Sequence, residues 1–303
     1  MDREYFQNSV HAILIVIIST LFIGCNEVFE PWQENDRYHF SIYGYLDASA
    51  DTQWVRVMPV REDLLYQPGP IDAVVTLENL ESGETVVMND SLFEYEHSVY
   101  AYNFWTSESL NPGDSYRIRV LRSDDAISSA VTTLPNDFPT PIIRNLERED
   151  QIIIEGAERL VDFRIIHYLQ FHNTDDEYMI PFSHLQDTLR MVSGGYMIIN
   201  DPRDDMNRLS QYFGMTPRTI THQQIFIVSG GPGFHFFPGI DEKIVALPEG
   251  ISNVTNGTGY LAGVVSKTIP YQSCLQLGTS NPAPCQLDPY PWSQNVQIWE
   301  PSN

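Results

Sequence analysis

Apolar and polar residues alternate along the chain from Tyr38 to Leu134, in short segments that are separated by turn signals. Each segment is rich in aromatic and β-branched residues, and the turns between them contain Gly, Pro, Asn and Asp. The expected strands are residues 38–46, 52–60, 73–80, 84–88, 92–96, 99–105, 115–121 and 127–134. A period of two, with a turn roughly every 8–12 residues, is typical of an antiparallel sandwich. We therefore predict an immunoglobulin-like β-sandwich over residues 38–135.

Three prolines, Pro135, Pro139 and Pro141, follow this region and predict a domain boundary. Beyond them, further apolar segments are expected to form strands: residues 151–155, 160–171, 178–182, 188–192, 196–199, 224–228, 243–247 and 259–266. These segments predict a second β-rich domain over residues 136–271. Residues 272–303 are rich in Pro, Ser, Asn and Gln, and we expect an irregular tail that is partly docked through Trp292 and Trp299.

One short helix is expected within the second domain. Apolar residues recur at helical spacing at positions 206, 209, 212 and 213 of the segment 204–215. Asp204 or Asp205 is expected to cap the start of this helix, and Gly214 its end. The predicted fold class is therefore mainly β, with a single short helix.

An apolar run from Ala12 to Gly24 precedes the sandwich and ends directly before Cys25. The run is too short to span a bilayer comfortably and suits the core of a signal peptide. The small residue before the cysteine and the polar residues after it resemble the lipobox of bacterial lipoproteins. That resemblance implies a signal peptide over residues 1–24 and acylation of Cys25, which would hold the chain on a membrane. The alternative is an uncleaved apolar anchor with an incidental cysteine. Residues 25–37 are polar and acidic, and we expect them to form a tether.

The net charge of the chain limits the classes of partner that it is expected to bind. The chain has 40 acidic residues against 17 basic ones and a net charge of −23. Such a surface repels nucleic acid and anionic lipid headgroups, so neither is expected as a partner. It would attract cations or a basic partner, although solubility is the simpler explanation.

The two remaining cysteines, Cys274 and Cys285, form an even pair in a chain that is expected to be exported. Such a pair predicts a disulfide. A metal site would need more ligands, and no histidine follows Cys285.

Several segments together resemble a family of lipoproteins of unknown function that is common in Bacteroidota. They are the Cys25 leader, IYGYLD (42–47), AVVTL (73–77), LNPGDSYRIRV (110–120), AVTTLP (130–135) and SNVTNGTGYLAGV (252–264). Members of this family are often encoded beside TonB-dependent outer-membrane receptors. The resemblance implies a lipid-anchored outer-membrane protein that faces the periplasm or the cell surface, with a transporter as a possible partner. It supplies no site residues.

The segment from Ser229 to Gly233, Ser-Gly-Gly-Pro-Gly, is the first candidate for catalytic chemistry. It resembles the His-Gly-Gly-Pro-Gly loop that supplies an oxyanion hole in some α/β-hydrolases. Serine replaces the histidine here, however, and the chain has neither a G-x-S-x-G motif nor alternating strands and helices. These departures favour a tight loop instead.

Three histidines, His167, His172 and His184, lie in sequence around the acidic run Asp175-Asp176-Glu177 and suggest a metal site. His167 and His172 are five residues apart, so on a strand their side chains point to opposite faces. We therefore expect exposed histidines at strand ends.

Three aspartates, Asp201, Asp204 and Asp205, offer oxygen ligands of the kind that calcium prefers. Their spacing differs from that of an EF-hand loop. Capping of the following helix explains at least one of them without an ion.

Aromatic residues fall on two neighbouring expected strands: Phe93, Tyr95, Tyr100, Tyr102, Phe104 and Trp105. Alternation places Tyr100, Tyr102 and Phe104 on one face, which we expect to be core. Trp105 lies on the other face and is the candidate for stacking against a ligand such as a sugar ring.

These features favour a non-enzymatic, membrane-anchored lipoprotein of the cell envelope that captures a ligand or accompanies an outer-membrane transporter. No catalytic residue and no cofactor are assigned. The alternatives are an exported hydrolase with an unrecognised site and an adhesive or structural envelope module.

Overall fold

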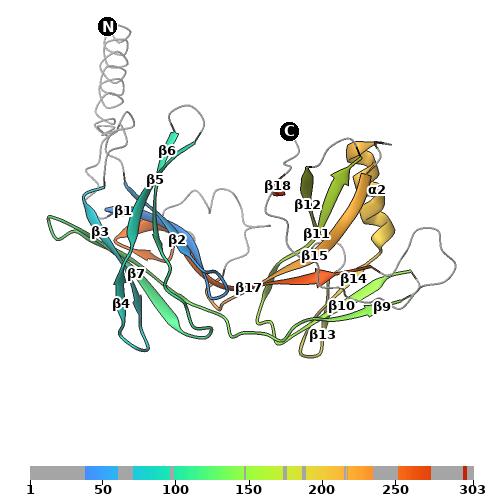
Figure 1. The fold of residues 1–303 in the computed structure, drawn as a ribbon. Helices are drawn as coiled ribbons and strands as arrows, with labels where there is room; N and C mark the ends of the chain where they lie inside the picture. The colour runs from blue at the N-terminus through green and yellow to red at the C-terminus, as the bar shows by residue number, and fades with distance from the viewer. Residues whose placement is uncertain are drawn as a thin grey trace, which may run out of the picture. The chain divides into compact units, whose positions relative to one another are not determined.

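A nine-stranded sheet runs through most of the folded chain (Figure 1). The computed structural model describes residues 38–60, 71–95, 99–146, 148–172, 176–185, 189–214, 216, 218–234, 252–273 and 296–298. The strands of the large sheet are β1 (Phe40–Asp47), β2 (Gln53–Pro59), β5 (Asn89–Tyr95), β6 (Val99–Thr106), β11 (Leu160–Phe171), β12 (Glu177–Ser183), β15 (Arg218–Gly230), β17 (Gly257–Tyr271) and β18 (Val296–Ile298). Their order across the sheet is β18-β12-β11-β15-β17-β1-β2-β6-β5.

The long strand β17 joins the two halves of this sheet. Residues 257–264 pair in parallel with β1, and residues 264–271 pair antiparallel with β15. The parallel pairing brings the two backbones close together. A Cβ atom on Gly259, whose φ is +115°, would lie 2.1 Å from the carbonyl oxygen of Ile42. Only glycine fits that position without displacing β1.

A five-stranded sheet packs on the first half of the large sheet and forms the first sandwich. Its order is β16 (Val254–Thr255), β8 (Ile127–Thr133), β7 (Ser115–Arg122), β3 (Ala73–Asn79) and β4 (Thr85–Val87). The core between the sheets contains Phe40, Ile42, Val55, Val57, Val75, Leu77, Tyr102, Phe104, Ile118 and Leu261. The predicted immunoglobulin-like sandwich is confirmed, and Tyr102 and Phe104 lie in its core as expected.

A four-stranded sheet packs on the second half and forms the second β-rich region. Its order is β13 (Leu189–Val192), β14 (Gly195–Asn200), β10 (Asp150–Glu155) and β9 (Ile142–Asn145). Isoleucines dominate this second core, which contains Ile152, Ile154, Phe163, Ile165, Ile198, Ile225, Ile227 and Val265.

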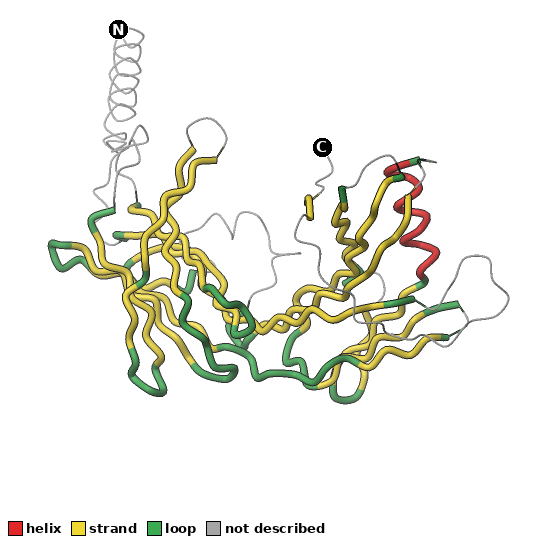
Figure 2. The backbone as a smooth tube through the Cα atoms, viewed as in Figure 1, coloured by secondary structure: helices red, strands yellow, loops and turns green. Residues whose placement is uncertain are grey.

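The helix α2 (Pro202–Phe213) lies against β11 and β12 through Leu209, which packs on Leu169, Ile180 and Phe182 (Figure 2, red). The side chain of Asp201 caps its start by accepting the N–H of Arg203 at 3.0 Å. The prediction that Asp204 or Asp205 caps the start is therefore wrong, because the helix begins at Pro202 and places both residues inside it. The predicted end at Gly214 is confirmed by its left-handed φ of 58°.

The predicted boundary near Pro135 falls between β8 and β9. However, β16 and the first half of β17 complete the first sandwich, which therefore extends beyond residues 38–135. The tail that we expected to be irregular contributes one strand, β18, which pairs in parallel with β12.

Several predictions lie outside the described residues: the signal peptide, Cys25, the tether up to Arg37, Cys274, Cys285, Trp292 and Trp299. In the part of the chain that the structure does describe, no helix combines the length and the hydropathy needed to cross a bilayer.

Candidate functional site

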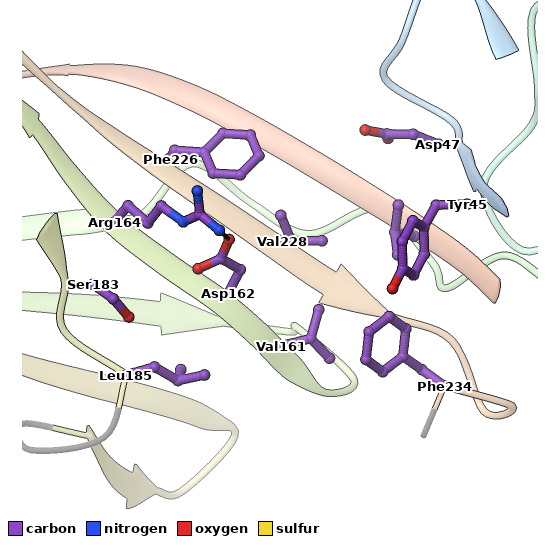
Figure 3. Close-up of a pocket in the computed structure, with 11 residues that line it drawn as sticks. Tyr45, Asp47, Val161, Asp162, Arg164, Ser183, Leu185, Phe226, Val228 and Phe234 are labelled. Atoms are coloured by element: carbon purple, nitrogen blue, oxygen red, sulfur yellow. Dashed lines mark ion pairs between the residues drawn. The ribbon is translucent and has the colours of Figure 1, made fainter. Parts of the chain in front are cut away.

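The outward face of the nine-stranded sheet is hollowed into a groove of about 480 Å³ over β11, β15, β17 and β1 (Figure 3). This volume falls within the range of small-molecule pockets. Val161, Val228 and Val264 line its apolar part, and Ser183 and Leu185 lie at the end of β12. The groove is therefore built mainly on central strands, whose positions are set by hydrogen bonds to neighbours on both sides.

Strand alternation decides which side chains face the groove. Asp162 and Arg164 alternate with fully buried core residues along β11, so they point to the opposite face. Phe226 and Val228 alternate with core residues along β15 in the same way. The register then sets Asp162 opposite Val228 and Arg164 opposite Phe226, which places charged and apolar groups side by side.

The polar groups of the groove are held in place by their partners. The Nη2 atom of Arg164 lies 2.8 Å from Oδ2 of Asp162, and the arginine side chain is about half exposed. Asp47 accepts hydrogen bonds from the hydroxyl and the N–H of Ser266 at 2.6 and 3.1 Å. The backbone N–H of Ser49 also donates to Asp47, at 2.9 Å. The groove thus presents two positioned carboxylates and one guanidinium to solvent.

One end of the groove is aromatic. The rings of Tyr45 and Phe234 are stacked, with centroids 6.0 Å apart and an angle of 23° between their planes. Tyr45 is 52 % exposed. The backbone N–H of Phe234 donates to the carbonyl of Gly231, and the guanidinium of Arg159 donates to the carbonyl of Phe234. These bonds fix the loop residue beside the strand residue.

The glycine-rich segment that we considered as an oxyanion hole is the turn that carries Phe234. The N–H groups of Gly230 and Gly231 donate to main-chain carbonyls at 2.8 and 2.9 Å, so both are used within the fold. A Cβ atom on Gly231 would lie 2.2 Å from the carbonyl oxygen of Thr133. Ser229 is completely buried. Close packing therefore explains Gly230 and Gly231, as the tight-loop interpretation expects.

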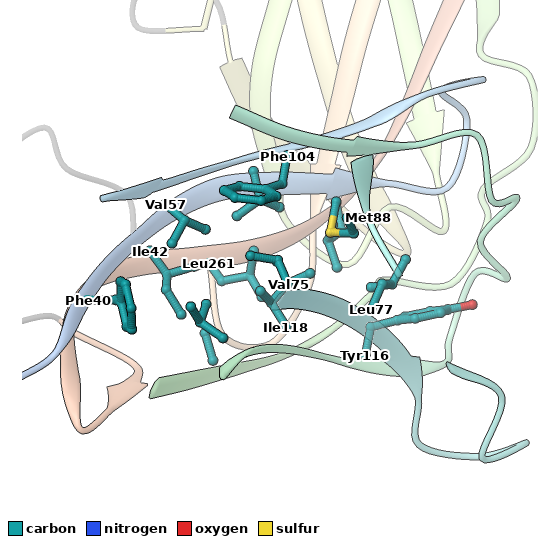
Figure 4. Close-up of a cluster of buried hydrophobic side chains, with 14 of the residues drawn as sticks. Phe40, Ile42, Val57, Val75, Leu77, Met88, Phe104, Tyr116, Ile118 and Leu261 are labelled. Carbon is teal, nitrogen blue, oxygen red and sulfur yellow. The ribbon is translucent and has the colours of Figure 1, made fainter. Parts of the chain in front are cut away.

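Trp105, which the sequence singled out for stacking, lies on the same outward face as the groove. It is opposite Trp54 in the register, and their ring centroids are 6.0 Å apart. Trp54 is in turn opposite Tyr45. Because opposite residues of paired strands project to the same side, Tyr45, Trp54 and Trp105 form an aromatic row that leads into the groove. Residues on the opposite face of the same strands, such as Val57 on β2 and Phe104 on β6, fill the first core (Figure 4).

Sequence reasoning did not single out Tyr45 and Trp54, although the signal was present. Both alternate with core residues in the first two strands and are large aromatic residues on the face opposite to the core. Their exposed fractions are 52 % and 43 %.

Two of the three histidines lie in the interior, so the expectation of exposed histidines is wrong for them. His167 and His184 are 1 % and 5 % exposed, because α2 covers this face of β11 and brings Asp205 against them. The Nε2 atoms of His167 and His184 lie 3.0 and 3.2 Å from the two carboxylate oxygens of Asp205. Burial alone would raise the pKa of Asp205, but the hydrogen bonds from the two histidines outweigh it and lower the pKa to about 2.

The rest of the predicted histidine cluster does not come together. His172 is exposed, as expected, and its Nε2 atom lies 3.1 Å from the hydroxyl of Thr219. Glu177 lies 3.5 Å from Nδ1 of His222. Asp176 is exposed, and Asp175 lies outside the described residues.

The three aspartates considered for calcium have different surroundings. Asp201 caps α2, and hydrogen bonding from Arg203 lowers its pKa. Asp204 is exposed, and Asp205 faces the buried histidines. Among the residues that the structure describes, no group of three or more His, Cys, Asp or Glu side chains is arranged to hold a metal ion.

A second buried carboxyl, which the sequence did not reveal, lies in the core of the second region. The hydroxyl of Tyr271 donates to Asp150, and the amide of Asn145 donates to the same carboxyl at 3.0 Å. The amide of Asn200 donates to the tyrosine oxygen at 3.2 Å. Burial raises the pKa of Asp150 and that of Tyr271. This network links β9, β10, β14 and β17.

No protein-family model and no curated protein matches this chain. Among solved structures, the chain is similar to the FN1–FN3 domains of chicken CNTN1, at 12% identity and a TM-score of 0.29, over 78% of this chain and 67% of that one. It is also similar to a pullulanase from Anoxybacillus sp. LM18-11, at 11% identity and a TM-score of 0.23. For the complex of that pullulanase with maltotriose, the identity is 10% and the TM-score is 0.22. Each pullulanase match covers 62% of this chain and 24% of the pullulanase, so the chain spans about a quarter of its length.

Proposed function

We propose that this protein is a non-enzymatic binding protein of the cell envelope that captures a ligand in the groove of its nine-stranded sheet. One observation supports this most directly. The exposed ring of Tyr45, stacked on Phe234, opens onto positioned polar groups, including the Asp162–Arg164 pair. A site built on hydrogen-bonded central strands needs little reordering when a ligand arrives, which favours binding.

A lipid on Cys25 holds the protein on the outer membrane in this proposal. Support comes from the sequence: the apolar run ends at Gly24, and the polar residues 25–37 supply a tether. In the oxidising envelope, Cys274 and Cys285 form a disulfide. Intact mass measured without reductant tests this bridge, because free thiols would contradict it.

The proposed partner is a TonB-dependent outer-membrane transporter. Support comes from the resemblance to envelope lipoproteins that are encoded beside such receptors. The net charge of −23 favours a partner with a basic face and faster association at low ionic strength.

Purification of the tagged full-length chain from its own membrane in mild detergent tests the partnership. We expect a transporter to be recovered in near-stoichiometric amounts with the wild type and in much smaller amounts with Cys25→Ala. Recovery of no envelope protein, or equal recovery with both chains, would contradict the partnership.

A parallel screen of the same preparations against ester, glycoside and peptide substrates tests the non-enzymatic part. Ser183 is the serine that lines the groove, so Ser183→Ala is the informative variant. We expect no turnover above that of a mock preparation. Robust turnover that Ser183→Ala abolishes would replace the binding protein with an exported hydrolase. A transporter-free protein that cross-links to itself or to the cell wall would instead indicate an adhesive or structural module.

A further inference from the structure

We propose that the groove and the aromatic row form one continuous surface that binds a neutral oligosaccharide. The ligand is bound and not cleaved, as in the function proposed above, on which this inference rests. Tyr45 belongs to both parts, because it lines the groove and stands opposite Trp54 in the row. The surface crosses six neighbouring strands, from β11 through β15, β17, β1 and β2 to β6. Five interstrand spacings of about 4.8 Å give a length of about 24 Å.

The position of this surface argues against an extended peptide. Peptides that recognise sheets usually add a strand at an edge, where unpaired N–H and C=O groups are available. The surface lies instead on the face of strands that have a hydrogen-bonded neighbour on each side. A ligand here must therefore be recognised through side chains.

Those side chains suit a ring with apolar faces and hydroxyl edges. Tyr45, Trp54 and Trp105 project from adjacent strands, and Trp54 remains 43 % exposed. Aromatic faces of this kind pack against the C–H faces of a sugar ring. Beside them, Asp47 and Asp162 offer acceptors, and Arg164 offers donors. Because a hydroxyl group both donates and accepts, one sugar can satisfy both kinds of group.

The net charge of the protein and the charged groups in the groove favour a neutral ligand over a charged one. The net charge of −23, with two carboxylates in the groove itself, disfavours an anionic chain. The half-exposed guanidinium of Arg164 disfavours a cation in its part of the groove. A neutral, hydroxyl-rich chain avoids both of these unfavourable electrostatic interactions.

Calorimetric titration of the full-length chain tests this assignment. The protein is kept in lauryldimethylamine oxide, because this detergent has no sugar headgroup that could occupy the site. The probes are neutral hexasaccharides of α-1,4-glucose, β-1,4-glucose, β-1,4-xylose and β-1,4-mannose, with hexagalacturonate and a hexalysine peptide as charged comparisons. We expect at least one neutral hexasaccharide to bind with a Kd of about 1 mM or below. It should bind more tightly than its trisaccharide, which is too short to reach both ends.

Single substitutions then test whether the saccharide binds at the aromatic row. Tyr45→Ala and Trp54→Ala should each weaken it about tenfold, the loss expected for one stacked ring. Tyr212→Ala removes an aromatic ring that is equally exposed but lies on α2, so it should leave the Kd unchanged. Circular dichroism of each variant checks that it remains folded.

Three results would overturn the inference: no neutral hexasaccharide binds at about 10 mM, only a charged probe binds, or the Kd is the same for the wild type, Tyr45→Ala and Trp54→Ala. These experiments distinguish failure of the proposed function from failure of the saccharide-binding inference. Loss of saccharide binding with a transporter still recovered removes this inference alone. Release of reducing ends from a bound hexasaccharide removes the non-enzymatic function and leaves the binding surface in place.

Discussion

The Nε2 atom of His167 on β11 lies 3.0 Å from Oδ2 of Asp205 on α2, and both side chains are 1 % exposed. The amide of Gln223 donates to Nδ1 of the same imidazole at 2.8 Å. The two nitrogens of this buried ring therefore each face a polar partner, the amide of Gln223 on one side and the carboxylate of Asp205 on the other. This polar contact and the apolar packing of Leu209 together fasten the helix to the sheet.

Removing the carboxylate should loosen this attachment. We expect Asp205→Ala to lower the free energy of unfolding by about 2–4 kcal/mol, because two buried imidazole groups lose their common partner. Asp204→Ala, one residue away on the exposed side of the same helix, should change it by less than about 0.5 kcal/mol. Urea denaturation of both variants measures the difference. Equal effects would show that the buried contact contributes nothing specific.

The same carboxyl predicts a pH dependence. Asp205 has a pKa of about 2 in the folded protein, below the ordinary value of about 4 in an unfolded chain. A lowered carboxyl pKa stabilises the folded state above the unfolded value, and that stability is lost as pH falls toward the folded pKa. The stability gap between wild type and Asp205→Asn should therefore shrink by about 2 kcal/mol between pH 4 and pH 2. A gap that widens over this range would contradict the assignment.

The Asp150–Tyr271 pair should respond to a fall in pH in the same direction but over a higher pH range, because the pKa of Asp150 is raised. Tyr271→Phe removes the hydroxyl that donates to Asp150 and should cost about 1–3 kcal/mol at pH 7. Burial already raises the pKa of Asp150, and loss of this donor raises it further, so the cost should be smaller at pH 4, where the carboxyl is closer to neutral. Tyr212→Phe, at an exposed site, is the matched control. A cost that is larger at pH 4 than at pH 7 would exclude this account.

The turn that carries Phe234 offers a pair of glycines with contrasting surroundings. A Cβ atom on Gly231 would meet the carbonyl oxygen of Thr133 at 2.2 Å, whereas a Cβ atom on Gly233 would meet nothing within 4 Å. We expect Gly231→Ala to destabilise the protein by about 1–3 kcal/mol and Gly233→Ala to be nearly neutral. Thermal unfolding of the two variants compares them directly. Similar midpoints would show that the turn adjusts freely.

Lipidation can be tested at the N-terminus. Metabolic labelling with a fatty-acid analogue should mark the wild type and miss Cys25→Ala, which should accumulate as the unprocessed precursor. The physical reason is that the cysteine thiol is the acylated group in lipoproteins that carry a lipobox. Equal labelling of both chains would instead favour an uncleaved anchor.

Local sequence patterns predicted much of the fold because they act over a few residues. Alternation identified the strands of the first sandwich and placed Tyr102 and Phe104 in its core. Apolar spacing and Gly214 identified the helix α2. The same alternation separated Trp105 from the core face, and so found one member of the aromatic row.

Such local patterns could not predict which strands, far apart in the sequence, pair with each other. The sequence by itself determined the β class, the positions of most strands and the face that each side chain takes, because a strand's pleat is a property of neighbouring residues. Tertiary structure alone decided that β17 joins both halves of the sheet, and thereby that Tyr45 and Arg164 line one groove. It also decided that Asp205 meets His167, 38 residues away, instead of capping its helix. These contacts depend on which strand pairs with which and on where the helix packs, and no local period encodes either choice.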